Sequence, residues 1–183
     1  MKKKTLIING SPRINGDSAF LINELRKHLR GEIIELSAYR SNIAPCIDCR
    51  ACWKKRGCVI KDDMRVIYDD DFDNVVLVSP IYMSCLTPPL MAVASRFQSY
   101  YCAKRFLEND FSPAQKKASL ILVGGGDGSP TPAINIAEWM FKQMNARGYR
   151  EYRVFSLKTD SIPTREDKEA ISRLPNLAKW LEE

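Results

Sequence analysis

Histidine is nearly missing from this chain, which carries a single example, His28. Histidine is the usual general base near neutral pH and the commonest metal ligand. Hydrolytic triads and zinc hydrolase centres are therefore hard to build from this sequence. His28 falls in an expected helix, one position from its apolar face, and we interpret it as a surface or boundary residue.

Long hydrophobic runs are also missing, since no stretch reaches the roughly 18 apolar residues that a membrane-spanning helix needs. The chain begins Met-Lys-Lys-Lys and passes directly into an expected strand, without an apolar signal segment. We therefore expect a cytoplasmic protein with no membrane partner. The net charge of +6 comes from scattered lysines and arginines, which suits anionic small ligands and predicts no nucleic-acid partner.

Two familiar nucleotide-binding signatures are missing as well: the Lys-Ser/Thr pair of nucleoside-triphosphate loops and the three spaced glycines of dinucleotide-binding folds. Residues 10–18 instead read Gly-Ser-Pro-Arg-Ile-Asn-Gly-Asp-Ser, directly after an apolar run. Backbone N–H groups can surround an anion in such a loop, the helix expected near Asp17 adds its dipole, and Arg13 adds a charge. A monophosphate fits best, and flavin mononucleotide (FMN) is the common redox-active one. The alternative is an ordinary turn with an Asp17 or Ser18 cap.

The remaining sequence predicts one α/β domain over residues 1–183. A chain of this length with 45% hydrophobic residues can bury one substantial core. Apolar runs at 5–9, 32–36, 74–79, 119–123 and 153–157 predict strands buried on both faces, as in parallel sheets. Helical apolar patterns alternate with them, and Pro175 is expected to kink or split the last helix. We expect a flavodoxin-like three-layer sandwich with a five-stranded parallel sheet in the order 2-1-3-4-5.

Three loops meet at one edge of such a sheet, because ligands bind beyond the carboxyl ends of strands where the winding direction reverses. They are the first loop, residues 10–17, and the loops at 80–88 and 124–131. Glycines at 124–126 let the main chain approach an isoalloxazine ring, whose reduced form needs donors near N1 and O2. Tyr82 either stacks on that ring or packs as an ordinary aromatic residue.

Four of the six cysteines lie close together in an irregular stretch, residues 37–61, as Cys46-x-x-Cys49-x-x-Cys52 followed by Cys58. Without an export signal, this number of cysteines argues against a disulfide framework. The spacing suits a 4Fe–4S cluster. Structural or free thiols, a zinc site and a labile disulfide are the alternatives, and spacing alone does not decide among them.

In combination, these motifs resemble those of a known family. Their order across about the first 130 residues is similar to the NADPH-dependent FMN reductase branch of the flavodoxin-like superfamily, including the iron-sulfur flavoproteins. The motifs are Gly10-Ser11-Pro12-Arg13 with Gly16 and Ser18, the four cysteines, Asp62-Asp63-Met64, and Ser79-Pro80-Ile81-Tyr82.

The resemblance implies an oxidoreductase that passes hydride from NAD(P)H through FMN to a quinone, a flavin or another small acceptor. The flavin would carry the chemistry, so no catalytic side chain is expected. It also implies a homodimer or a higher homo-oligomer. The alternative is an iron-sulfur flavoprotein that carries electrons between protein partners.

The candidate site residues follow from the loops and from the resemblance. The expected cofactor-binding residues are Ser11, Pro12, Arg13, Asn15, Gly16, Asp17, Ser18, Pro80, Ile81, Tyr82, Met83, Ser84, Gly124, Gly125, Gly126 and Asp127. The candidate ligands of a 4Fe–4S cluster are Cys46, Cys49, Cys52 and Cys58.

Overall fold

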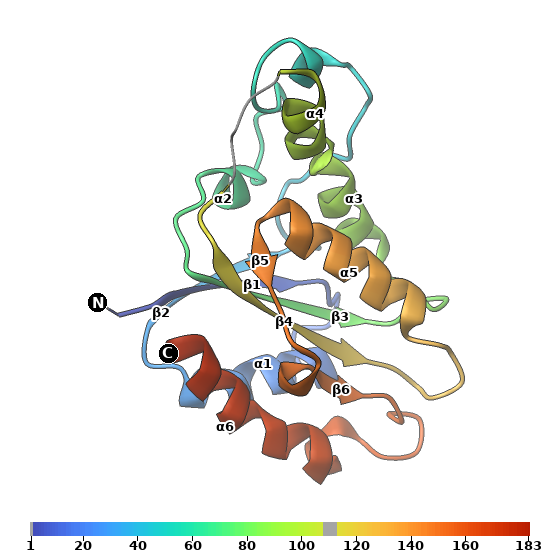
Figure 1. The fold of residues 1–183 in the computed structure, drawn as a ribbon. Coiled ribbons are helices and arrows are strands. Elements are labelled where there is room, and N and C mark those ends of the chain that lie inside the picture. The colour runs from blue at the N-terminus through green and yellow to red at the C-terminus, as the bar shows by residue number, and fades with distance from the viewer. Residues whose placement is uncertain (1, 108–112) are drawn as a thin grey trace.

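A parallel sheet forms the centre of the computed structural model, which describes residues 2–107 and 113–183 (Figure 1). Its strands are β1 (Lys4–Asn9), β2 (Glu32–Ser37), β3 (Asn74–Pro80), β4 (Lys116–Val123), β5 (Ala146–Arg147) and β6 (Val154–Ser156). They pair in the order β2-β1-β3-β4-β5, with β6 also paired to β4. The expected flavodoxin-like order is thereby confirmed.

The fifth position of the sheet is shared by two short strands, where we expected one strand at 153–157. β5 pairs with the first residues of β4, Lys116 and Lys117, whereas β6 pairs with its last three residues. The residues between β5 and β6 leave the sheet. Gly148, just after β5, passes so close to β4 that a Cβ there would lie 2.6 Å from the carbonyl oxygen of Ala118. A two-residue strand carries no periodic pattern, so sequence reasoning missed β5.

Helices cover both faces of the sheet (Figure 1). On one face lie α1 (Asp17–His28) and α6 (Lys168–Glu182), and on the other lie α3 (Pro88–Arg96) and α5 (Thr131–Gln143). α4 (Gln98–Phe106) follows α3 and lies beyond it, away from the sheet. A short helix, α2 (Arg65–Tyr68), precedes β3, and 3₁₀ turns occur at η1 (Ala51–Trp53), η2 (Arg150–Tyr152) and η3 (Thr164–Glu166).

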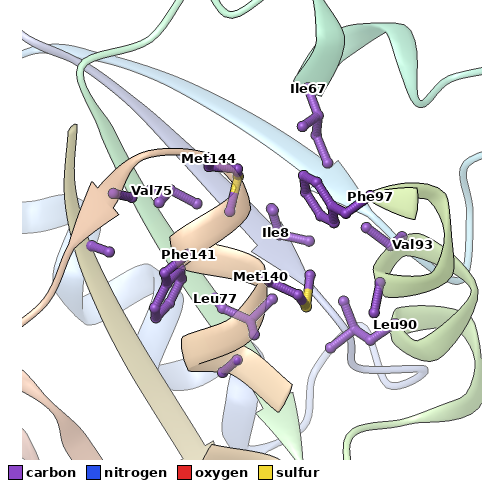
Figure 2. Close-up of a cluster of buried hydrophobic side chains, with 14 of the residues drawn as sticks. Ile8, Ile67, Val75, Leu77, Leu90, Val93, Phe97, Met140, Phe141 and Met144 are labelled. Atoms are coloured by element: carbon purple, nitrogen blue, oxygen red, sulfur yellow. The ribbon is translucent and has the colours of Figure 1, made fainter. Parts of the chain in front are cut away.

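Alternation along the strands divides the interior into two clusters. Ile8 and Leu77 point toward α3 and α5, where they join Leu90, Phe97 and Met140 (Figure 2). Neighbouring strand residues point to the opposite face and pack under α1 and α6. Strands buried on both faces explain the continuous apolar runs in the sequence.

Two helical segments differ from a simple reading of their sequences. The apolar pattern from Leu90 to Tyr101 is divided at Phe97 into α3 and α4, which buries Tyr100 and leaves Tyr101 40% exposed. α6 continues through Pro175, which lies on its exposed side, so the proline does not split the helix. His28 is exposed at the end of α1, as expected. Across residues 2–107 and 113–183, no helix has the length and apolar character needed to cross a membrane.

Candidate functional site

The first loop, residues 10–18, is shaped by its own polar groups. The Asn9 side chain accepts a hydrogen bond from the backbone N–H of Ser11 (2.9 Å) and donates one to Glu35 (2.9 Å). The Ser11 hydroxyl then accepts from the backbone N–H of Arg13 (3.2 Å). These bonds turn the chain sharply at the end of β1, so the following N–H groups gather at the start of α1.

The start of α1 leaves donors free. Gly16 is the N-cap and provides no side-chain cap. Asp17 accepts instead from the distant N–H of Thr164 (3.2 Å). Within the described residues, the backbone N–H groups of residues 14–19 donate no hydrogen bond, and neither does the Ser18 hydroxyl, although Ser18 is 2% exposed. An uncapped positive helix end with unused donors suits an anion and argues against an ordinary capped turn.

The loop after β3 contains a strained two-residue turn. Tyr82 and Cys85 exchange backbone hydrogen bonds of 3.0 and 2.9 Å across it. Met83 (φ 49°) and Ser84 (φ 64°) both lie in the left-handed region, which is the pattern of a type I′ turn. The Ser84 carbonyl also accepts from the N–H of Ala133 (3.1 Å) at the start of α5. Left-handed conformations at two non-glycine residues are costly, and such strain gathers at ligand sites.

The loop after β4 packs tightly against the segment that follows β6. The Gly124 carbonyl accepts from both the N–H (2.9 Å) and the hydroxyl (3.1 Å) of Thr159. A Cβ at Gly125 would lie 2.4 Å from a carboxylate oxygen of Asp160, and Gly126 has φ 133°. Gly126 is therefore required by its backbone conformation, and Gly125 lets the Asp160 carboxylate approach the main chain.

These loops line one depression of about 250 Å³ at the carboxyl edge of the sheet, which we call the loop cleft. The expected residues that line it are Ser11, Pro12, Arg13, Gly16, Asp17, Ser18, Pro80, Ile81, Tyr82, Gly124 and Gly125. Five expected residues do not line it: Asn15, Met83, Ser84, Gly126 and Asp127.

Sequence reasoning missed three residues that line the loop cleft: Val123, Thr159 and Asp160. Thr159 and Asp160 belong to the segment after β6, which carries no recognisable motif. The available signal was topological, because the fifth position of the sheet also ends at this edge. Tyr39, just after β2, does not line the cleft, and burial and the neighbouring Tyr82 raise its pKa.

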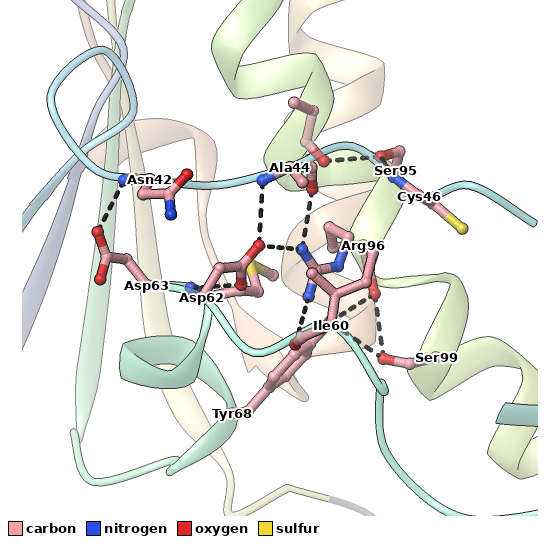
Figure 3. A network of polar contacts seen from close by, with 12 residues as sticks. Asn42, Ala44, Cys46, Ile60, Asp62, Asp63, Tyr68, Ser95, Arg96 and Ser99 are labelled. Carbon is pink, nitrogen blue, oxygen red and sulfur yellow. Dashed lines mark hydrogen bonds and ion pairs between the residues drawn. The ribbon is translucent and has the colours of Figure 1, made fainter. Parts of the chain in front are cut away.

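A buried ion pair fixes the cysteine loop, residues 37–61, against α3 (Figure 3). The Arg96 guanidinium is 1% exposed and donates to Asp62 and to the carbonyls of Ala44 (2.8 Å) and Ile60 (3.3 Å). Burial alone would raise the pKa of Asp62, but Arg96 and the N–H groups of Ala44 and Met64 lower it overall. The pair therefore stays ionised and joins both ends of the loop to one helix.

All four candidate cysteine ligands line a single small hollow beside Arg96, which we call the cysteine hollow. Each of the six thiols is free, so the labile disulfide is not formed. Among the described residues, no three Cys, His, Asp or Glu side chains are close enough to hold one metal ion. Zinc needs sulfurs about 2.3 Å from a single ion. The four thiols therefore do not converge on one metal ion in this arrangement.

Cys52 differs from the other three cysteines of the hollow. Burial and the neighbouring thiol of Cys102 raise the pKa of Cys52 to about 11. Its thiol is therefore protonated at neutral pH in this arrangement. Cys102, on α4, is a buried fifth thiol next to the hollow that the sequence motif does not include.

Comparison with known proteins identifies the family. The sequence model of the NADPH-dependent FMN reductase family matches residues 3–146, from β1 to the start of β5. The chain belongs to this family. The match to the FMN reductase family includes the first loop, the cysteine loop, and the loops after β3 and β4. It ends before the segment that contributes Thr159 and Asp160 to the loop cleft.

Curated relatives are iron-sulfur flavoproteins. One from Methanocaldococcus jannaschii is 33% identical over 99 residues, which are 51% of this chain and 50% of the relative. Another, from Archaeoglobus fulgidus, is 29% identical over 125 residues, 66% of this chain and 60% of the relative. The chain thus spans about half the length of the first of these relatives.

Solved structures share the fold of this FMN reductase family member. An NAD(P)H:quinone oxidoreductase from Methanothermobacter marburgensis has a TM-score of 0.69 and 15% identity, covering 100% of this chain and 98% of that chain. An FMN-dependent NADH-azoreductase from Bacillus anthracis, solved with FMN, has a TM-score of 0.68 and 14% identity, covering 99% and 100%. At such identities the similarity establishes a common fold.

Proposed function

We propose that this chain binds FMN in the loop cleft and acts as an NAD(P)H-dependent oxidoreductase. The observation that carries the proposal is the uncapped start of α1, where the N–H groups and the Ser18 hydroxyl have no hydrogen-bond acceptor within the described residues and Ser18 lines the loop cleft. Membership of the FMN reductase family supports FMN as the anion-bearing ligand.

The chain's own residues would bind and orient the cofactor. The N–H groups of residues 14–18, the Ser18 hydroxyl and Arg13 would hold the phosphate, while Tyr82 and Gly124 would border the ring. When bound, FMN supplies hydride transfer from NAD(P)H to an acceptor. The side chains would contribute position and hydrogen bonds. Asp160 is available to accept from hydroxyl groups of the ribityl chain.

The acceptor we propose is a small planar molecule, such as a quinone or a flavin. Tyr39 and Tyr82 are partly exposed at this edge, and Met83 is 94% exposed at the tip of its turn. Aromatic and thioether side chains at the rim favour flat apolar molecules over charged ones. The expected homo-oligomer and the cytoplasmic location stay predictions.

Anaerobic titration of the FMN-loaded protein with NADPH and with NADH tests this function. We expect one equivalent of nucleotide to bleach the flavin absorption, and a quinone to restore it. A bound flavin that neither nucleotide reduces would contradict the reductase proposal while leaving FMN binding intact.

A second candidate, an iron-sulfur flavoprotein that carries electrons, is favoured by the cysteine hollow. Its four thiols are the soft ligands that a 4Fe–4S cluster requires, and a buried cation lies beside them. Protein purified without oxygen would then contain iron and sulfide in equal amounts. Loss of both in Cys49→Ser, with FMN retained, would support a cluster; wild type lacking both would exclude it.

A further inference from the structure

A second hollow adjoins the loop cleft on the outer side of the first loop. It has a volume of about 380 Å³ and is lined by Arg13, Asn15, Gly16, Asp17, Phe20 and Arg165. We call it the arginine hollow. It shares Arg13, Gly16 and Asp17 with the loop cleft, so the two depressions meet at the start of α1.

Arg165 is held in place by its neighbour in η3. Thr164 is 0% exposed and donates its backbone N–H to the Asp17 carboxylate (3.2 Å). Its hydroxyl also forms a 3.0 Å hydrogen bond with that of Ser156 at the end of β6. These contacts hold η3 against the first residue of α1 and the end of β6. The backbone of Arg165 is therefore held in place beside the first loop.

The two arginines of the hollow form no ion pair within the described residues, and the one carboxylate that lines the hollow with them is that of Asp17. Neither the Arg13 nor the Arg165 side chain forms an ion pair or a hydrogen bond with any described residue. By contrast, Arg26, Arg96 and Arg153 are each paired with a carboxylate. Two unpaired guanidinium groups on one small hollow repel each other, and a dianion between them would offset that repulsion.

Ser18 gives independent support for an anion at this point. The residue is largely buried and lines the adjoining loop cleft, and its hydroxyl forms no hydrogen bond within the described residues. A hydroxyl with unused hydrogen-bonding capacity on the wall of a cleft can donate to an anion that binds there.

We propose that Arg13 and Arg165 clamp a phosphomonoester dianion at the start of α1. The inference rests on the proposed function and deepens it by adding a cationic residue from outside the family match, which ends at residue 146. Both the 5′-phosphate of FMN and the 2′-phosphate of NADPH are phosphomonoesters. The wall shared with the loop cleft favours the phosphate of FMN.

Binding of FMN and riboflavin to the apoprotein separates the phosphate contribution from that of the ring. In Arg165→Gln we expect FMN affinity to fall about 10- to 100-fold, as for loss of a charged hydrogen-bond donor, with riboflavin affinity unchanged. Lys168→Gln is the matched control, because Lys168 begins α6 nearby but does not line the hollow. Arg165→Lys keeps the positive charge but lacks the planar guanidinium group, so it should show an intermediate loss of FMN affinity.

A second arm compares the KM values for NADPH and NADH. If Arg165→Gln raises the KM for NADPH alone and leaves FMN affinity unchanged, the clamp holds the nucleotide phosphate instead. If Arg165→Gln and Lys168→Gln behave alike in both arms while wild type binds FMN, the clamp is overturned and the proposed function stands. Wild type that binds neither FMN nor riboflavin would overturn the proposed function itself.

Discussion

Single polar side chains distinguish binding from stability in this molecule. The Ser18 hydroxyl has no hydrogen-bond partner among the described residues and lines the loop cleft, so it adds little to folding. We expect Ser18→Ala to weaken FMN binding about 10-fold or more with little change in the free energy of unfolding. Flavin fluorescence and urea denaturation measure the two quantities. Equal losses of stability and affinity would contradict a ligand-binding role.

Asp62 shows the opposite behaviour, because its partner is a charge inside the protein. Asp62→Asn leaves the Arg96 guanidinium buried without a counter-charge and should lower the free energy of unfolding by about 3–5 kcal/mol. The control is Glu169→Gln, which breaks an exposed pair with Arg173 and should cost under about 1 kcal/mol. Urea denaturation compares the two variants, and similar losses would contradict this account.

The pH dependence of the Asp62 pair follows from its lowered pKa. A carboxylate with a lowered pKa in the folded state adds stability above the ordinary Asp pKa of about 3.9, and this stability is lost as the pH falls below that value. The difference in stability between wild type and Asp62→Asn should therefore be constant near neutrality and shrink in acid. A difference that grew in acid would show that the pair is not ionised.

At the scale of secondary-structure elements, the turn between α1 and β2 contacts both the end of α6 and Lys3, the residue before β1. The carboxylate of Glu182, at the end of α6, accepts from the N–H groups of Arg30 (2.7 Å) and Gly31 (3.0 Å). A Cβ at Gly31 would lie 1.9 Å from the backbone carbonyl oxygen of Lys3, which β1 holds in place. Gly31 therefore allows the turn between α1 and β2 to pack closely against Lys3 and the end of α6.

Gly31→Ala should accordingly displace the start of β1 and lower the free energy of unfolding by about 1–3 kcal/mol. Gly128→Ala is the control, since a Cβ there would meet only the Ser84 hydroxyl at 3.4 Å, an ordinary contact. Thermal and urea denaturation measure both. A Gly31→Ala protein as stable as Gly128→Ala would contradict the close approach of this turn to Lys3.

For the whole molecule, the site depends on segments that follow four strands of the sheet. Residues after β1, β3, β4 and β6 line the loop cleft, so a ligand there stabilises the complete fold. FMN at 100 times its Kd should add about 2.7 kcal/mol and raise the Tm by about 5–10 °C. Adenosine monophosphate, which has the phosphate without the ring, should have a much smaller effect. No rise with FMN would contradict the proposed binding.

The sequence by itself determined the parallel sheet, its strand order and most of the loop cleft. Strands buried on both faces must be continuously apolar, and right-handed crossovers leave few ways to connect them. The first loop was recognisable as a phosphate-binding candidate because its small residues, Arg13 and the start of the helix lie within nine consecutive positions. These are local or periodic features, which a linear sequence displays directly.

Only the tertiary structure decided which distant groups meet. Thr159, Asp160 and Arg165 reach the site because β6 and η3 bring a segment without a motif beside α1. Folding buries Arg96 against Asp62, 34 positions away in the chain. The division of the fifth strand and the break at Phe97 likewise follow from packing. Contacts between residues far apart in the chain depend on the assembled fold, and no local pattern encodes them.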